Sequence, residues 1–235
     1  LTDAILIGAD LTRAHLRDAN LSGSNLTDAG LASTGLYNAI LIGANLTRAE
    51  LTKANVTDAD LTRANLTEAT LTEADFRNSN LYRCRLAHAV LTRTGFSYAN
   101  LAWANLIGAD LRGVNLEGVD LSAAYLSNSN LTGSNLAGAN LRYATLVNVN
   151  LDDSDLDSAN LSHAVLTGAS LLRSKIGGAD LSKANLRNAN FAGADLYRSF
   201  LLHIALIVPV QQPSLRDFQK VSPLDKRDHL EKQMT

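Results

Sequence analysis

A large apolar residue recurs at every fifth position of the chain from Leu1 to Leu206, without interruption. Leucine fills 37 of these 42 central positions, and the others hold Val56, Phe76, Phe96, Ile176 and Phe191. Two residues before the central position, 27 of 41 residues are Ala, and most of the rest are Ser, Thr, Val or Cys. These patterns predict a chain of five-residue units, each with one large and one small inward position.

A spacing of five excludes both regular structures. On an α-helix five residues rotate the apolar position by about 140° and spread it around every face. On a strand an odd spacing alternates the faces. A short extended piece followed by a turn in every unit keeps both positions inside. Turn-forming residues support this, because Asn or Asp precedes 24 of the 41 central residues and Gly is frequent two residues after them. Such units must stack as a solenoid to bury their leucines.

Two consecutive units, 59–63 (Ala-Asp-Leu-Thr-Arg) and 64–68 (Ala-Asn-Leu-Thr-Glu), match the A(D/N)LXX motif. In this the chain resembles the pentapeptide repeat family over residues 1–206. The resemblance implies an all-β fold, a right-handed quadrilateral parallel β-helix with four units per coil. Phe76 and Phe96 then stack on one side. About ten coils at about 4.8 Å each predict a rod about 50 Å long.

We assign residues 1–208 to the repeat domain and residues 209–235 to a C-terminal tail. Pro209 and Pro213 end the repeat, because proline cannot donate a ladder hydrogen bond. Ser214 and Ser222 are placed to begin one or two short helices. We expect these to cap the open end of the rod or to form an end-to-end homodimer, as in some family members, through the apolar residues Leu215, Phe218, Val221 and Leu224.

With the implied coil of twenty residues, one outward column is basic and aromatic and holds the only Trp of the chain: Arg63, Arg83, Trp103, Ala123, Tyr143, His163, Lys183 and His203. Exposed Trp, Tyr and Arg are enriched at protein interfaces. We therefore predict a surface that binds a partner protein, made of Arg63, Tyr82, Arg83, Trp103, Tyr143 and His163. Two alternatives are scattered solvated side chains and base stacking by a single-stranded nucleic acid.

Charge and motif content argue against other classes of function. Lys and Arg total 21 against 23 Asp and Glu, so no long-range field predicts a nucleic-acid or membrane partner. There is no zinc-ligand spacing, Gly-rich phosphate loop or nucleophile elbow, and a convex rod provides no catalytic pocket. We expect no enzymatic activity, no catalytic residue, no cofactor and no metal. An acidic group at Asp152, Asp153, Asp155 and Asp157 is a cation site, a phosphate-mimicking patch or a solvated edge.

Two further features bear on compartment. The most apolar window, 200–210, is far shorter than the roughly 20 residues of a membrane span, and no signal peptide is visible. Cys84 occupies an inward small position, where we expect it to replace Ala. A soluble protein is expected, with the cytoplasm favoured.

The leading functional hypothesis is a non-enzymatic scaffold that mediates protein–protein interaction. The alternative follows from the resemblance, since the fluoroquinolone-resistance members are acidic rods that mimic DNA and bind DNA gyrase, a type II topoisomerase. The net charge of only −2 and the uninterrupted register count against this alternative.

Overall fold

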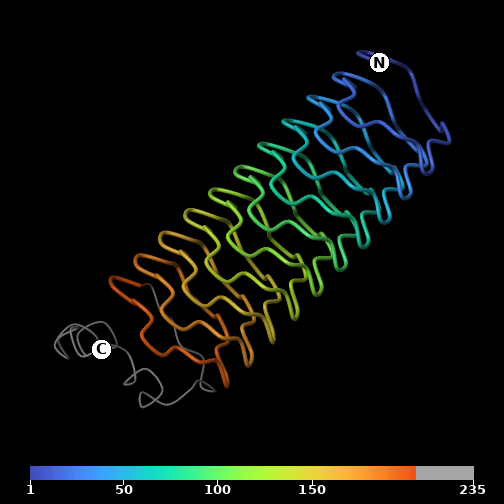
Figure 1. The fold of residues 1–235 in the computed structure, drawn as a ribbon. Coiled ribbons are helices and arrows are strands. Elements are labelled where there is room, and N and C mark those ends of the chain that lie inside the picture. The colour runs from blue at the N-terminus through green and yellow to red at the C-terminus, as the bar shows by residue number, and fades with distance from the viewer. Residues whose placement is uncertain (205–235) are drawn as a thin grey trace.

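The protein, represented by a computed structural model that describes residues 1–204, is a four-sided rod of stacked coils (Figure 1). This part of the chain contains no helix and no continuous strand, because each unit pairs through a single bridge residue. The bridges are parallel and join each such residue to the one twenty positions later, from Ile5 with Asn25 to Asp180 with Phe200. The register confirms the all-β solenoid and the four units per coil. The right-handed winding and the total of about ten coils remain predictions.

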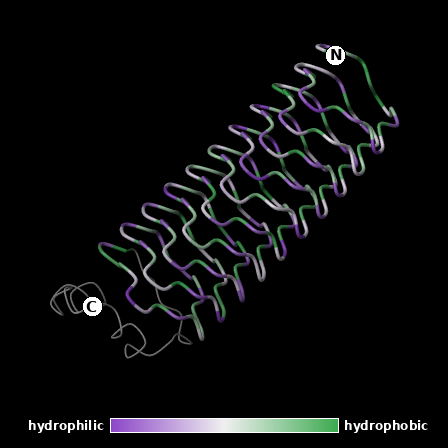
Figure 2. Ribbon diagram, viewed as in Figure 1, coloured by the Kyte–Doolittle hydropathy of each residue, from purple (hydrophilic) through white to green (hydrophobic). Residues whose placement is uncertain are grey.

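The central residues fill the interior of the rod. Every one from Leu21 to Leu201 is buried, whereas Leu1 in the first coil is 59% exposed. Phe76 and Phe96 stack with ring centroids 5.2 Å apart, as the spacing of twenty predicted. Full burial of one such side chain contributes about 2 kcal/mol. Hydrophobic and hydrophilic residues alternate within each coil along the whole rod (Figure 2). The buried central residues form a continuous line of large apolar side chains, mostly leucine.

Each central residue begins a tight turn. The N–H three residues later donates to its carbonyl, for example Ala64 N to Leu61 O at 2.9 Å. The third residue of the turn has a positive φ in all 41 turns from Asp3 to His203, which is the signature of a type II turn. Glycine fills only 11 of these positions. Most turns therefore hold a side chain in the left-handed region, at a cost of roughly 1 kcal/mol each.

The Asn or Asp before each central residue completes the backbone hydrogen bonding. In the unit 61–65, four N–H groups donate to backbone oxygens at 2.7 to 2.9 Å. The fifth, from Thr62, donates to Asp60 Oδ1 at 2.9 Å. Amide side chains also link neighbouring coils, as Asn100 Nδ2 donates to Asn80 Oδ1 at 3.1 Å. The side chain thus accepts the one N–H that the ladder leaves unpaired.

Two predicted features fall outside the described residues. They are the boundary between residues 208 and 209, and the tail residues expected to form a cap or a dimer contact, Leu215, Phe218, Val221 and Leu224. Within residues 1–204, no helix has the length and hydropathy that a membrane crossing requires.

Candidate functional site

One corner of the rod gathers the predicted partner-binding residues. The turns that begin at Leu61, Leu81 and every twentieth residue after them stack above one another, because the bridges pair residues twenty apart. We call eight side chains of the turns from Leu61 to Leu181 the basic corner: Arg63, Tyr82, Arg83, Trp103, Arg142, Tyr143, His163 and Lys183. Each occupies the second or third position of its turn, outside the leucine core.

Arg83 is the centre of a first cluster in the basic corner. Its Cζ lies 5.2 Å from the ring centroid of Tyr82, on the same turn, and 5.9 Å from that of Trp103, on the next coil. Both distances are in the range of cation–π attraction. Trp103 is 47% exposed and Arg83 is exposed as well. The rings therefore position the guanidinium while its N–H groups remain accessible to another molecule.

A second cluster lies two coils further along. The rings of Tyr143 and His163 are 4.7 Å apart between centroids. Arg142 Cζ lies 4.9 Å from the Tyr143 centroid, and its Nη2 donates to Tyr143 Oη at 3.3 Å. Tyr143 is 51% exposed and His163 is half-buried. Ala123, on the intervening coil, separates this cluster from the first.

Five of the six predicted residues thus join one of the two clusters. The exception is Arg63, which is exposed on the coil before Arg83 and makes no ring contact or ion pair within residues 1–204. Arg142 was not predicted. The available signal was its position beside Tyr143, since the same two turn positions hold Tyr82 and Arg83 in the reverse order.

The basic corner differs in charge from the rest of the rod. A column is the set of residues that occupy one position in successive coils, twenty residues apart. The two turn columns of the basic corner and the bridge column that follows them hold five Lys or Arg residues against one carboxylate, Asp3 in the first coil. The other outward columns of residues 1–204 hold eleven Lys or Arg against eighteen Asp or Glu. All eight ion-paired cations of the described chain lie in those other columns. The near-neutral net charge is therefore an average over unlike columns, and the bridge column before the basic corner adds three carboxylates, Asp60, Asp120 and Asp180.

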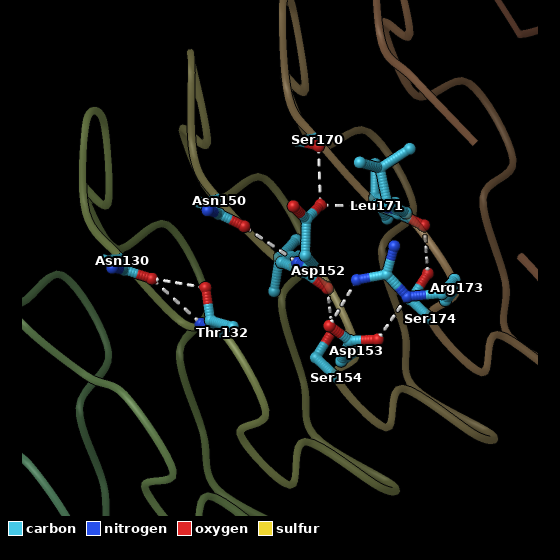
Figure 3. A network of polar contacts seen from close by, with 12 residues as sticks. Asn130, Thr132, Asn150, Asp152, Asp153, Ser154, Ser170, Leu171, Arg173 and Ser174 are labelled. Carbon is cyan, nitrogen blue, oxygen red and sulfur yellow. Dashed lines mark hydrogen bonds and ion pairs between the residues drawn. The ribbon is translucent and has the colours of Figure 1, made fainter. Parts of the chain in front are cut away.

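The acidic group is occupied by contacts with the next coil, as Figure 3 shows for Asp152 and Asp153. Asp152 Oδ1 accepts hydrogen bonds from the Ser170 hydroxyl at 2.5 Å and from Leu172 N at 3.0 Å. The Arg173 guanidinium donates to both carboxylate oxygens of Asp153, each at 2.7 Å. These hydrogen bonds lower the pKa of the Asp153 carboxyl below its ordinary value.

The remaining acidic residues have the same structural role. Asp155 accepts a hydrogen bond from Lys175 Nζ at 3.2 Å, and Asp157 Oδ1 accepts one from Gly177 N at 2.8 Å. The Asp157 contact supplies the acceptor that Asn or Asp at position 175 would otherwise provide. Among the described residues, no group of three or more His, Cys, Asp or Glu could hold a metal ion. The acidic group is therefore explained by contacts between coils.

Cys84 is buried in the core, as predicted for a substitute of Ala. Its Sγ lies 3.2 Å from Ala64 O. Burial raises the pKa of the Cys84 thiol far above its ordinary value, so the reactive thiolate does not form near neutral pH.

Comparison with known proteins agrees with this architecture. The model of the pentapeptide repeat family matches in eight copies over residues 1–31, 36–67, 59–97, 69–106, 96–133, 134–173 and 166–201. HetL, a pentapeptide repeat protein involved in heterocyst differentiation regulation from the cyanobacterium Nostoc sp. strain PCC 7120, is 33% identical. That alignment covers 88% of this chain and 91% of HetL, with a TM-score of 0.51.

Two other solved structures are similar. Rfr23 from the cyanobacterium Cyanothece 51142 is 34% identical over 44% of this chain and 87% of its own, with a TM-score of 0.39. QnrB1, a plasmid-mediated fluoroquinolone resistance protein, is 16% identical over 77% of this chain and 94% of its own, with a TM-score of 0.49. No curated protein matches the chain.

Proposed function

The chain belongs to the pentapeptide repeat family, and on that premise we propose that it is a non-enzymatic scaffold that binds a partner protein through the basic corner. The observation that carries this proposal is Trp103, 47% exposed with Arg83 held against its ring. In this proposal the rod has about ten right-handed coils over residues 1–208, and residues 209–235 cap its end.

The fold itself does not require Trp103. The same turn position in other coils of the same column is filled by small residues such as Gly43 and Ala123. Clustered Trp, Tyr and Arg are the residues that most often dominate binding energy at interfaces, with losses of about 2 kcal/mol or more on truncation. Arg83 and Arg142 are already oriented by rings, which reduces the entropy lost when a partner binds.

A regulatory role is consistent with a rod that acts by binding. The relative HetL is described as involved in the regulation of heterocyst differentiation, and it shares the fold over most of both chains. The supporting evidence for this chain remains the basic corner, since the leucine core and the backbone of the turns serve the fold.

Affinity capture from the source cell tests the proposal. The wild type is compared with Trp103→Ala plus Arg83→Ala. The matched control is Arg17→Ala plus Tyr37→Ala, which removes a cation–π pair at 4.7 Å from another corner. We expect partner recovery to fall at least tenfold for the first variant and to be unchanged for the control, with circular dichroism spectra like that of the wild type. Equal recovery by all three proteins would remove the basic corner from consideration.

The alternative function, a DNA mimic that binds DNA gyrase, needs an acidic surface that is free to bind. On this rod Asp28, Asp75, Asp110 and Asp153 are engaged by arginines at 2.6 to 2.7 Å. A gyrase supercoiling assay with and without a fluoroquinolone discriminates the two functions. We expect no effect of the protein, whereas protection of supercoiling would favour the alternative.

A further inference from the structure

The cations at and beside the basic corner lack the carboxylate partners that eight of the eleven other cations of residues 1–204 have. On the other columns, eight Lys or Arg side chains pair with Asp or Glu at 2.6 to 3.8 Å. Within residues 1–204, the two turn columns of the basic corner and the bridge column that follows contain no acidic residue after Asp3, whereas the bridge column that precedes them holds Asp60, Asp120 and Asp180. Five cations there make no ion pair with any described residue: Arg63, Arg83, Arg85, Arg142 and Lys183.

From this contrast we infer that the partner presents an extended, carboxylate-rich protein segment to the basic corner. The inference rests on the proposed function and specifies the chemistry of the partner. No carboxylate of the described chain forms an ion pair with these five cations, and carboxylates match the planar donor fork of arginine. The three carboxylates in the bridge column before the turns of the basic corner, Asp60, Asp120 and Asp180, accept turn N–H groups from Thr62, Ser122 and Ser182. None of the three forms an ion pair with a described cation, so the five cations stay available to an acidic segment.

The dimensions of the basic corner fit an extended segment. Arg63 and Lys183 are six coils apart in the register of twenty. At about 4.8 Å per coil they are separated by roughly 29 Å, the reach of about nine extended residues. Arg83 and Arg142 lie between them, so that cations recur along the length of such a segment.

The ring contacts favour carboxylates over nucleic-acid bases. Base stacking needs open aromatic faces. Here Trp103 already has Arg83 against its ring, and Tyr143 has both His163 and Arg142 close to its ring. The guanidinium N–H groups are the accessible recognition elements, and each ring acts as a support for an arginine.

The test measures binding of the full chain to a fluorescein-labelled peptide rich in Glu and Asp, by fluorescence anisotropy at low and at physiological salt. A matched peptide with Gln and Asn, and an oligothymidylate of similar length, are the comparison ligands. We expect the acidic peptide to bind, with affinity that falls as salt rises, and to bind at least tenfold tighter than either comparison ligand.

Two double variants locate the binding. Arg83→Ala plus Arg142→Ala removes the central cations of the basic corner. The control, Arg48→Ala plus Arg173→Ala, removes the same charge from cations that are paired with Asp28 and Asp153. We expect the first to weaken peptide binding at least tenfold and the control to weaken it less than twofold. Equal loss in both variants would reduce the effect to net charge and overturn the inference.

The outcomes separate this inference from the proposed function. If affinity capture depends on the basic corner but the acidic peptide binds no better than its amide counterpart, the acidic partner is wrong and the scaffold function stands. If oligothymidylate binds tightest, the partner is a nucleic acid and the inference is overturned. If neither capture nor peptide binding depends on the basic corner, both proposals fall.

Discussion

The basic corner and the acidic group around Asp152 and Asp153 occupy the same two turn positions of the repeating unit, but their charged side chains make different contacts. They lie two turns apart in a coil of four turns, on diagonally opposite corners. At the acidic corner each carboxylate is satisfied by the next coil, through Ser170, Leu172 and Arg173. At the basic corner Arg83 and Arg142 lie against aromatic rings, and no cation of the corner forms an ion pair with a described residue. A charged side chain that the next coil neutralises stabilises the rod. A charged side chain that remains exposed without an ion pair is available to a partner.

The largest expected effect on the free energy of unfolding comes from a substitution in the core. Phe76→Ala removes a fully buried ring that stacks on Phe96 at 5.2 Å. We expect the free energy of unfolding to fall by about 3 to 5 kcal/mol, because a cavity remains in a close-packed core. Urea unfolding followed by circular dichroism measures it. A loss below about 1 kcal/mol would mean that the rod collapses around the missing ring.

Substitutions at the two corners should separate stability from binding. Asp152→Ala leaves the Leu172 N–H and the Ser170 hydroxyl without their acceptor, so we expect a loss of about 1 kcal/mol in unfolding free energy and unchanged peptide binding. Arg83→Ala should show the reverse, with unfolding free energy within about 0.5 kcal/mol of the wild type and weaker binding. A larger loss of unfolding free energy for Arg83→Ala than for Asp152→Ala would contradict this separation of stability from binding.

Buried serine hydroxyls inside the rod also differ in whether they have a hydrogen-bond partner. Ser129 Oγ donates to Leu126 O at 2.7 Å, whereas Ser134 Oγ is buried without a hydrogen-bond partner among the described residues. Ser134→Ala should therefore stabilise the protein by up to about 1 kcal/mol, and Ser129→Ala should destabilise it by about as much. Thermal unfolding of both variants measures the two changes in stability. Shifts of the melting temperature in the same direction would contradict the prediction.

Ala123 lies between the two clusters of the basic corner, so a cation placed there tests whether added positive charge strengthens binding of the acidic peptide. Ala123→Arg places a cation where the turn already accepts one, since Arg83 has a φ of 57° at the equivalent position and Ala123 has 54°. We expect acidic-peptide affinity to rise about twofold to threefold, for a gain of about 0.5 kcal/mol. Ala123→Gln is the uncharged control. An equal gain from glutamine would assign the effect to contact area.

The smallest expected effect is a dependence on acidic pH. Hydrogen bonds from Arg173 lower the pKa of Asp153, and hydrogen bonds from Arg112 lower that of Asp110. Because the folded pKa lies below the ordinary value of 3.8, the stabilising contribution is fully present above that value and is lost as pH falls through the folded pKa. Urea unfolding at about pH 6 and about pH 3 measures the loss. Arg173→Ala should show a smaller pH dependence than the wild type, and an unchanged one would contradict the assignment.

The repeat made most of the interior predictable from the sequence. The period of five places the leucines, and the small position correctly predicts the burial of Cys84. The spacing of twenty between Phe76 and Phe96 predicts their stacking once four units per coil are known from the resemblance. These predictions succeed because burial depends on position in the unit alone.

The contacts of the surface depend on register and on side-chain conformation together. Arg142 joins the second cluster because its guanidinium turns onto Tyr143, and the period does not determine that orientation. Asp157 accepts the N–H of Gly177 on the next coil, so its role was hidden within an acidic run. The positive φ of residues such as Trp103 was also unexpected, because the turn imposes it on any side chain.

The intrinsic fluorescence of Trp103 gives the most direct test of the central claim, that the basic corner is the binding surface. It is the only Trp in the chain, so its emission and its quenching by acrylamide report on that corner alone. Titration with the Glu- and Asp-rich peptide should shift the emission saturably and protect Trp103 from acrylamide. If the emission and quenching of Trp103 stay constant while anisotropy shows the same peptide saturating the protein, binding occurs elsewhere and the account is contradicted.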